Sequence, residues 1–499
     1  MKKVILMKKV ILIIMLLLPL SINAQIQKER KWARMHYMDK LYIESFKEFS
    51  QLAKFMDPGD LFMLAQHYQY GQGTERNLNK AIECYKLASE RGDDLSQAEL
   101  CDILFSNKMY ESDKGKKELY KYSRMFSTNY SYSSSTGSVE DNARFALYLC
   151  YKNGWGTQAN PLLADIWLAY AAYNDSMDAQ DEFCEKFGIN GDYNSEEEEM
   201  NLECTYFRHL YERISPYIKE DKTIETSFFE IIYLISKQDT NATIEGLKKI
   251  LLLYDNSELD SIGKAVLHNL IMITSKYNND LKEKYGSDIE KYELISEEEK
   301  EAWQYKQLTK VVWKVDVILN KTNKPYGRSN GHDWVDLGLP SGTKWSTRNI
   351  GAEEPQDPGA LYAWAESVPK KIYSYDNYTE PYLYILDDAN DTARQILGGK
   401  WNVPTCEDWR ELFLYCDVKY DAVKSVFIAK GPNNQYVTIP LVQNSEKDGV
   451  IYWTNTCVLS VMEPEEGSAI SFLLDTDPYW NLTYANKWRG CPVRPVLKD

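Results

Sequence analysis

Apolar residues in the first two thirds of the chain recur with the period of an α-helix. Residues 60–92 carry two such faces at helical spacing. The first face contains Leu61, Leu64, Ala65 and Tyr68, and the second contains Ala81, Ile82, Tyr85 and Ala88. A Gly-Gln-Gly turn at 71–73 separates them, and Gly92 follows at a position typical of a left-handed C-cap. The pattern predicts a helical hairpin.

The same layout returns 83 residues later, which is the offset between Gly71 and Gly154. Alanines let two helices approach closely, and glycines accept backbone angles that other residues resist. The positions that define the predicted repeat are Leu64, Tyr68, Gly71, Gly73, Ala81, Tyr85, Ala88, Gly92, Leu147, Tyr151, Gly154, Gly156, Ala164, Leu168 and Ala171. A match at a fixed offset indicates an internal repeat.

The segment DLFMLAQHYQYGQGTERNLNKAIECYKLASERGD resembles a Sel-one-like repeat, a relative of the tetratricopeptide repeat, and ALYLCYKNGWGTQANPLLADIWLAYAA resembles a second copy. Between them, AELCDILFSNKMYESDKGKKELYKYSRMF aligns with Leu100 under Leu64 but lacks the glycine turn, so we interpret it as a degenerate copy. The resemblance implies a solenoid over residues 60–185. Such repeats generally form curved surfaces that hold other proteins and are not catalytic.

The segments on either side of the repeats are also predicted to be helical. Residues 25–59 form a helical lead-in, and residues 186–318 keep the helical period without a clear repeat motif. A diverged continuation of the solenoid and a separate helical bundle both fit residues 186–318. In either case the N-terminal part is all-α.

The amino-acid composition and the hydrophobic pattern change near residue 320. Residues 319–331 have the composition of a linker, and residues 332–499 contain short runs rich in aromatic and β-branched residues, such as YVTIPLV and VIYWTNT. One helix is predicted after Thr405, because Trp409, Leu412, Phe413 and Cys416 keep helical spacing. The chain is therefore predicted to be multidomain, with an N-terminal helical-repeat solenoid and a C-terminal α+β domain.

Three ordered blocks in residues 332–499 (VDLGLPSGTKW, GGKWNVPTCEDW and VRPV) are similar to the Fibrobacter major paralogous domain family. That family is grouped with C-type-lectin-like folds, which implies a compact domain that binds carbohydrate or protein. Calcium-dependent lectins need a Glu-Pro-Asn or Gln-Pro-Asp loop and a Trp-Asn-Asp strand. Gln356-Asp357-Pro358 has a different order and Trp480-Asn481-Leu482 lacks the final acid, so we expect no bound calcium.

Aromatic side chains are the candidate ligand-binding residues of this domain, because an exposed ring stacks on a sugar or fills a partner's pocket. The candidates are Trp364, Tyr452, Trp453, Tyr479, Trp480 and Trp488. Burial in the core is the competing interpretation for each of them. Trp345, Trp401 and Trp409 lie inside the family-like blocks and are predicted to be core residues.

The first 24 residues have the pattern of a secretory signal peptide. A basic start precedes an apolar run from Val10 to Leu20, which is shorter than the about 20 residues that span a bilayer. We therefore expect leader cleavage after Ala24, no transmembrane anchor, and export to the periplasm, the cell surface or the medium. The net charge of −16 disfavours nucleic acid as a partner.

The sequence contains no recognisable catalytic motif or ligand set. The chain has nine cysteines, which we expect to be mostly free and buried, and its five histidines lack metal-ligand spacing. We also find no GxSxG, HExxH, Walker A or GxGxxG motif. We therefore expect no cofactor, no metal and no enzymatic activity. The favoured function is a scaffold for protein partners, and the alternative is a carbohydrate-binding surface protein.

Overall fold

The computed structural model describes residues 28–52, 57–90, 93–128, 137–192, 195–274, 295–320, 325–379, 383, 385–441, 449–458, 468–475 and 480–498. The predicted signal peptide lies outside these residues. Residues 97–321 form one compact unit, and residues 1–96 and 322–499 are assigned to a second unit. The division between the units lies within the region predicted as repeats.

Residues 28–90 form two helical hairpins. Residues 28–38 are helical, and they precede α2 (Tyr42–Leu52), α3 (Pro58–Tyr70) and α4 (Leu78–Glu90). Helix α3 begins with a capping box between Asp57 and Asp60, and Gly71 ends it in the left-handed conformation. The hairpin of α3 and α4 confirms the prediction for the first repeat.

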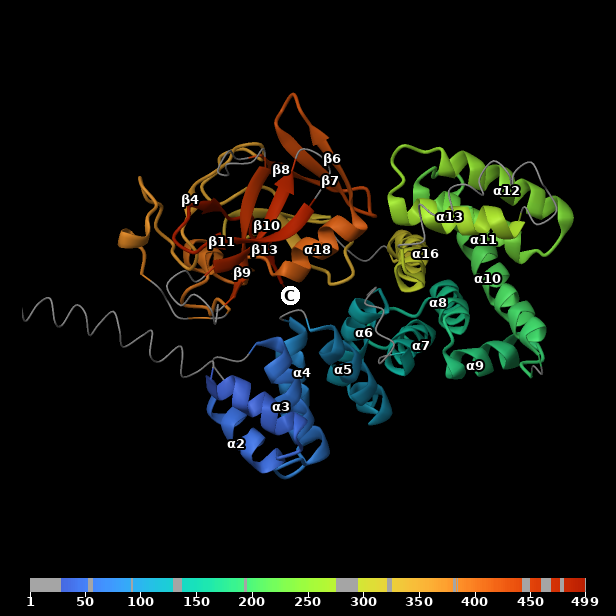
Figure 1. The fold of residues 1–499 in the computed structure, drawn as a ribbon, viewed down its shortest axis with the longest axis horizontal. Coiled ribbons are helices and arrows are strands. Elements are labelled where there is room, and N and C mark those ends of the chain that lie inside the picture. The colour runs from blue at the N-terminus through green and yellow to red at the C-terminus, as the bar shows by residue number, and fades with distance from the viewer. Residues whose placement is uncertain are drawn as a thin grey trace, which may run out of the picture. The chain divides into compact units, whose positions relative to one another are not determined.

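The unit of residues 97–321 is helical, with no strand in its described ranges (Figure 1). Its elements are α5 (Asp94–Ser106), η2 (Met109–Glu111), α6 (Asp113–Ser127), α7 (Gly137–Asn153), α8 (Pro161–Tyr173), α9 (Met177–Phe187), α10 (Glu196–Ile218), α11 (Ile224–Ser236), α12 (Thr240–Tyr254), α13 (Ser261–Thr274) and α16 (Glu297–Leu319). Helices α7 and α8 form the second predicted hairpin. In the degenerate copy, the 3-10 turn η2 takes the place of the glycine turn.

Residues 325–498 contain strands and two short helices. The elements are β1 (Tyr326–Ser329), β2 (His332–Asp336), β3 (Lys344–Ser346), β4 (Leu361–Tyr362), η3 (Tyr375–Asn377), α17 (Thr392–Leu397), β5 (Trp401–Asn402), α18 (Cys406–Tyr415), β6 (Asp417–Asp421), β7 (Val426–Lys430), β8 (Tyr436–Pro440), β9 (Gly449–Val458), β10 (Ser468–Asp475), β11 (Trp480–Asn486), β12 (Cys491–Pro492) and β13 (Val496–Leu497). Helix α18 confirms the helix predicted after Thr405, which caps it.

The strands form four small sheets. The largest has the order β1-β2-β3-β13-β5, two others are β11-β10-β9 and β6-β7-β8, and β12 pairs with β4. Strand β13 is antiparallel to both neighbours, since Val496 pairs with Trp345 on one side and Asn402 on the other. The chain therefore returns to its first strands to complete the largest sheet. This part of the protein is α+β, as predicted.

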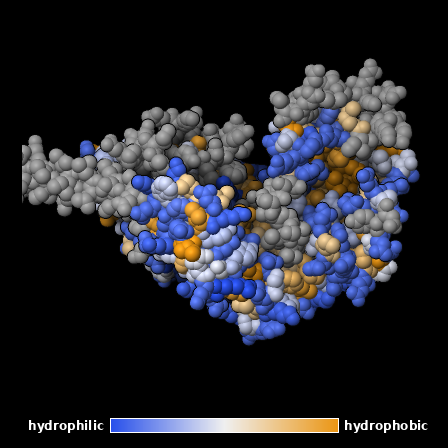
Figure 2. Space-filling view, turned by 60° about the horizontal axis from the view of Figure 1, so that its bottom comes forward, coloured by the Kyte–Doolittle hydropathy of each residue, from blue (hydrophilic) through white to orange (hydrophobic). Residues whose placement is uncertain are grey.

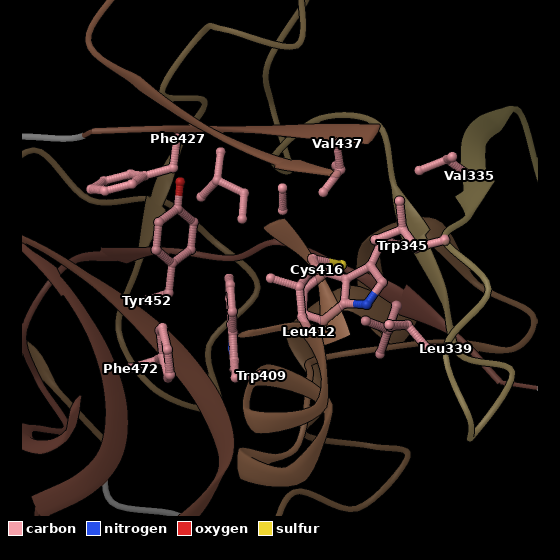
Figure 3. Packing of buried hydrophobic residues seen from close by; sticks show 14 of the residues in the cluster. Val335, Leu339, Trp345, Trp409, Leu412, Cys416, Phe427, Val437, Tyr452 and Phe472 are labelled. Atoms are coloured by element: carbon pink, nitrogen blue, oxygen red, sulfur yellow. The ribbon is translucent and has the colours of Figure 1, made fainter. Parts of the chain in front are cut away.

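The core of this part is built on tryptophan. Trp409 of α18 stacks on Phe472 of β10 with a centroid distance of 4.9 Å, and it packs against Trp345 in an edge-to-face arrangement with a centroid distance of 4.8 Å (Figure 3). Trp345, Trp401 and Trp409 have no solvent exposure, which confirms the prediction that they are core residues. Aromatic pairs of this kind add stability beyond the area that they bury.

The second glycine of each repeat turn lies against the backbone of the helix that precedes the hairpin, which is α2 for Gly73 and α6 for Gly156. A Cβ added to Gly73 would be 2.1 Å from the carbonyl oxygen of Tyr42, and one added to Gly156 would be 2.5 Å from that of Lys116. Both glycines also have positive φ angles, of 72° and 70°. The turn therefore requires glycine for close approach as well as for its conformation.

We expect Gly73→Ala to destabilise the N-terminal hairpins much more than Gly71→Ala. Both glycines have positive φ, so each substitution costs about 1 kcal/mol from conformation alone. Only at Gly73 would the methyl group overlap backbone atoms, whereas at Gly71 the nearest atom is 3.3 Å away. Urea unfolding of the two variants measures the difference, which we expect to exceed about 2 kcal/mol. Equal losses would contradict the close approach.

Candidate interaction surface on the helical repeats

The residues that define the repeat occupy equivalent places in the two hairpins. The leucines and alanines are buried between the paired helices, and the four turn glycines have positive φ. Tyr68 is half-buried, whereas Tyr151, its counterpart, is fully buried. Gly92 lies outside the described residues. The difference between the two tyrosines shows that something covers the second repeat.

Helix α16 covers the second repeat. The buried carboxylate of Asp316 accepts hydrogen bonds from the Tyr151 hydroxyl at 2.9 Å and from the Trp167 indole nitrogen at 2.6 Å. Tyr151 comes from α7 and Trp167 from α8, so one carboxylate joins both helices of the hairpin. Burial raises the pKa of Asp316, although nearby Arg124 and the two hydrogen bonds oppose this shift.

Contacts continue along the length of α16. Thr309 forms a hydrogen bond with the hydroxyl of Tyr170, and the Arg144 guanidinium lies 4.9 Å from the centroid of the Tyr305 ring. At the C-terminal end, the Asn320 amide donates to the Tyr120 hydroxyl of α6 at 2.9 Å. Figure 1 shows α16 between the hairpin helices α6–α8 and the helices α11–α13. Helices α6, α7 and α8 thus form a surface that binds a helix.

The chemistry of this surface favours a partly apolar helix that carries an acid. Aromatic rings provide contact area, while neutral hydroxyl and indole donors satisfy a carboxylate that has left water. Arg124 adds a positive charge, and its guanidinium lies 4.9 Å from the centroid of the Trp313 ring. These features match α16, which is a segment of the same chain.

A second polar cluster joins the N-terminal hairpins. Arg30 and Arg34, from the helix at 28–38, form ion pairs with both Asp57 and Asp60 at the start of α3. Asp60 is fully buried. These carboxylates also cap α3, so the cluster fixes how successive hairpins stack.

His67 is buried near the end of α3. Its Nδ1 lies 2.6 Å from the carbonyl oxygen of Gln72 and its Nε2 lies 3.0 Å from the Ser45 hydroxyl. A carbonyl only accepts, so Nδ1 carries the proton. Desolvation lowers the pKa of His67 despite the opposing backbone hydrogen bond. The neutral imidazole is therefore the form that fits the fold.

Three of the aromatic ligand candidates are buried in the C-terminal part. The indole nitrogen of Trp364 donates to the Thr454 carbonyl at 3.0 Å, and that of Trp453 donates to the Tyr362 carbonyl at 2.7 Å. The Tyr452 hydroxyl donates to the Pro440 carbonyl at 2.9 Å. All three rings are at most 1% exposed. These three are therefore core residues rather than exposed ligand candidates, as the competing interpretation held, because pairing the polar atom with a backbone carbonyl lets each ring enter the core.

The other three candidates do not complete a ligand site. Trp488 is half-buried, whereas Tyr479 and the side chain of Trp480 lie outside the described residues. The structure therefore does not bring the described candidates together on one exposed face. On the face shown in Figure 2, hydrophilic residues cover most of the coloured surface, and hydrophobic residues appear in groups between them.

Buried carboxylates with raised pKa values in this part hold the chain together. Burial raises the pKa of Glu411 to about 7, and its oxygens accept from the hydroxyl and backbone N–H of Ser341. Burial likewise raises the pKa of Asp391 to about 6, and this residue caps α17 and accepts from the Val403 N–H. Both groups have a structural role, since their oxygens accept from backbone N–H groups and, for Glu411, also from a hydroxyl.

The described residues offer neither a metal centre nor a disulfide. They contain no cluster of three or more histidine, cysteine or acidic side chains suited to a metal ion. All nine cysteines are described, none is in a disulfide, and most are buried, as predicted. No helix in the described ranges has both the length and the apolar character needed to cross a membrane.

Sequence reasoning missed the residues of α16 that contact the repeat. Asp316 and Thr309 form hydrogen bonds with residues about 140 to 165 positions earlier in the chain. The available signal was an acid within the apolar run VVWKVDVIL, since a buried charge requires partners. The pattern does not say which helix supplies them.

Comparison with known proteins identifies the repeats. The Sel1 repeat family model matches residues 60–93 and 143–176. A Sel1 repeat protein from Oxalobacter formigenes is 14% identical, with 53% of this chain and 100% of that chain covered and a TM-score of 0.24. A protective antigen of uropathogenic Escherichia coli strains, which displays an SLR fold, is 14% identical, with 61% and 65% covered and a TM-score of 0.26. Both TM-scores are low, and no curated protein matches. The chain contains two Sel1-like repeats.

Asp316→Ala is expected to lower the free energy of unfolding of residues 97–321 by about 2 to 4 kcal/mol, because it leaves the Tyr151 and Trp167 donors buried without their acceptor. Urea unfolding followed by tryptophan fluorescence measures the loss. The control is Asp113→Ala, at a side chain that is 96% exposed, which should change stability by less than about 0.5 kcal/mol. Similar effects at both positions would contradict the role of Asp316.

Stability of the N-terminal hairpins is expected to fall as the pH drops below about 6.5, the pKa of an unfolded histidine. The pKa of folded His67 is lower, so protonation favours the unfolded chain. Its contribution is complete above pH 6.5 and is lost as the pH falls through the folded value. His67→Gln should flatten this dependence, measured by thermal unfolding between pH 5 and 8. An unchanged slope in His67→Gln would refute this assignment.

Proposed function

We propose that this chain is an exported, non-catalytic scaffold or adaptor that binds protein partners through its helical repeats. The observation that supports this function is the occupation of the second repeat by α16, which displays the type of contact that the repeat surface makes. Sel1 repeats are generally modules for protein–protein interaction, and two segments match that family. Export rests on the pattern of the first 24 residues.

The alternative is a carbohydrate-binding surface protein that acts through residues 332–499. Its support is the resemblance of this segment to the Fibrobacter major paralogous domain and the part-exposed ring of Trp488. The burial of Trp364, Tyr452 and Trp453 weakens it, because those rings cannot stack on a sugar without unpacking the core. We therefore favour the scaffold.

Cross-linking of the full-length chain tests the two functions. Lysine-reactive cross-linker is applied to the purified chain in an envelope extract of the source organism, and the linked peptides are mapped by mass spectrometry. We expect recovered proteins to be linked within residues 28–274 and 295–320. A glycan array is probed with the same chain in parallel. Links confined to residues 325–498, together with glycan binding, would replace the scaffold by the alternative.

A further inference from the structure

The likeness between the two repeats extends to the helix that precedes each of them. Gly73 approaches the start of α2 in the way that Gly156 approaches the start of α6. Tyr68 packs edge-on against Phe46 of α2, with a centroid distance of 5.3 Å and an interplanar angle of 84°. Tyr151 packs in the same way against Tyr120 of α6, at 5.8 Å and 82°. Helices α2–α4 therefore repeat the arrangement of α6–α8.

The four residues that form hydrogen bonds with Asp316, Thr309 and Asn320 have equivalent positions on α2–α4. At the offset of 83 residues that the two family matches share, Tyr151 corresponds to Tyr68, Trp167 to Cys84 and Tyr170 to Leu87. Tyr120 corresponds to Phe46, as the ring packing shows. We call Phe46, Tyr68, Cys84 and Leu87 the first-repeat face.

The first-repeat face is only partly buried. Leu87 is 39% exposed, and the other three side chains are partly buried against the core of the N-terminal hairpins. Among the described residues, the Tyr68 hydroxyl has no hydrogen-bond partner, whereas that of Tyr151 binds Asp316. Of the helices in residues 28–90, α2–α4 are the counterparts of α6–α8, and the helix at 28–38 contacts the start of α3 through Arg30 and Arg34.

A positive charge also recurs beside the first-repeat face. The ammonium group of Lys80, an exposed residue in the first turn of α4, lies 5.1 Å from the centroid of the Tyr68 ring. On the second repeat, Arg124 is the cation near the Tyr151–Asp316 pair. A phenol hydroxyl with a nearby cation is complementary to a carboxylate. The hydroxyl and the cation that accompany Asp316 on the second repeat therefore have counterparts at the first-repeat face.

We propose that the first-repeat face binds an amphipathic helix of a partner protein, and that an aspartate or glutamate of this helix accepts the hydrogen bond of Tyr68 beside Lys80. The apolar side of the helix covers Leu87, Cys84 and Phe46, as α16 covers their counterparts. This inference rests on the proposed scaffold function and specifies the partner's chemistry. Such a helix is recognised through anchors at i, i+3 or i+4, and i+7.

A displayed library of random 20-residue peptides tests the proposal on the full-length chain. Peptides are selected on the wild-type chain and counter-selected on Leu87→Glu, which places a charge in the face. The matched control is Leu252→Glu, at an exposed leucine of α12. Enriched peptides should share helical apolar spacing and one acidic position, and they should bind Leu87→Glu at least about tenfold more weakly than wild type or Leu252→Glu. The proposal is overturned if the selected peptides are extended or proline-rich, or if Leu87→Glu leaves their affinity unchanged.

The acid is tested by a double-mutant cycle on the best peptide. Tyr68→Phe should weaken binding about five- to tenfold for the acidic peptide and leave the binding of its amide variant unchanged. Circular dichroism of the purified Tyr68→Phe chain checks that the hairpins remain folded. Equal effects of Tyr68→Phe on both peptides refute the predicted hydrogen bond.

Failure of this inference is distinguishable from failure of the scaffold function. The selected peptide is added to the cross-linking reaction in the envelope extract. Loss of the partner's links to α2–α4 supports the proposed face. If partners still link to the helical repeats at saturating peptide, the first-repeat face is not their site and the scaffold function stands. If no protein links to the repeats, the scaffold function fails as well.

Discussion

The organisation of residues 97–321 depends on one buried carboxylate. Asp316 holds the Tyr151 hydroxyl and the Trp167 indole at once, so it ties α16 to both helices of the second repeat. An ion in this position is tolerated only because the donors replace water and Arg124 lies nearby. The same requirement fixes the orientation of α16, since sliding it by a turn would move the carboxylate away from its donors.

The local parts of this architecture could be predicted from the sequence. The first hairpin was predictable from Leu64, Tyr68 and the glycine turn at 71–73, because helical periodicity and glycine conformation depend on neighbours a few residues away. The offset of 83 residues between Gly71 and Gly154 then predicted the second copy of the repeat. Thr405 likewise marked the start of α18, since a capping box is contained within four residues.

The parts that could not be predicted depend on contacts between distant residues. A single sequence does not reveal that α16 lies on the second repeat, because helical patterns specify an apolar face and not its partner. Trp364 and Trp453 illustrate the same limit. A tryptophan side chain suits a binding site and a core equally. Here the backbone carbonyls of Thr454 and Tyr362 accept the indole hydrogen bonds, so both rings can be buried in the core. The antiparallel order of β13 between β3 and β5 is also non-local.

The position of β13 affects how the C-terminal part can be made. Strands β1, β2 and β3 are synthesised about 150 residues before Val496, yet they share a sheet with it and β5 has no other neighbour there. The sheet therefore cannot close while residues 496–497 are still inside the ribosome, and pairing over such separations is slow. Helical hairpins such as α3 and α4 need only local contacts. The nascent chain can therefore fold its helical repeats first, while the sheet of β1, β2, β3 and β5 stays incomplete until β13 has been synthesised.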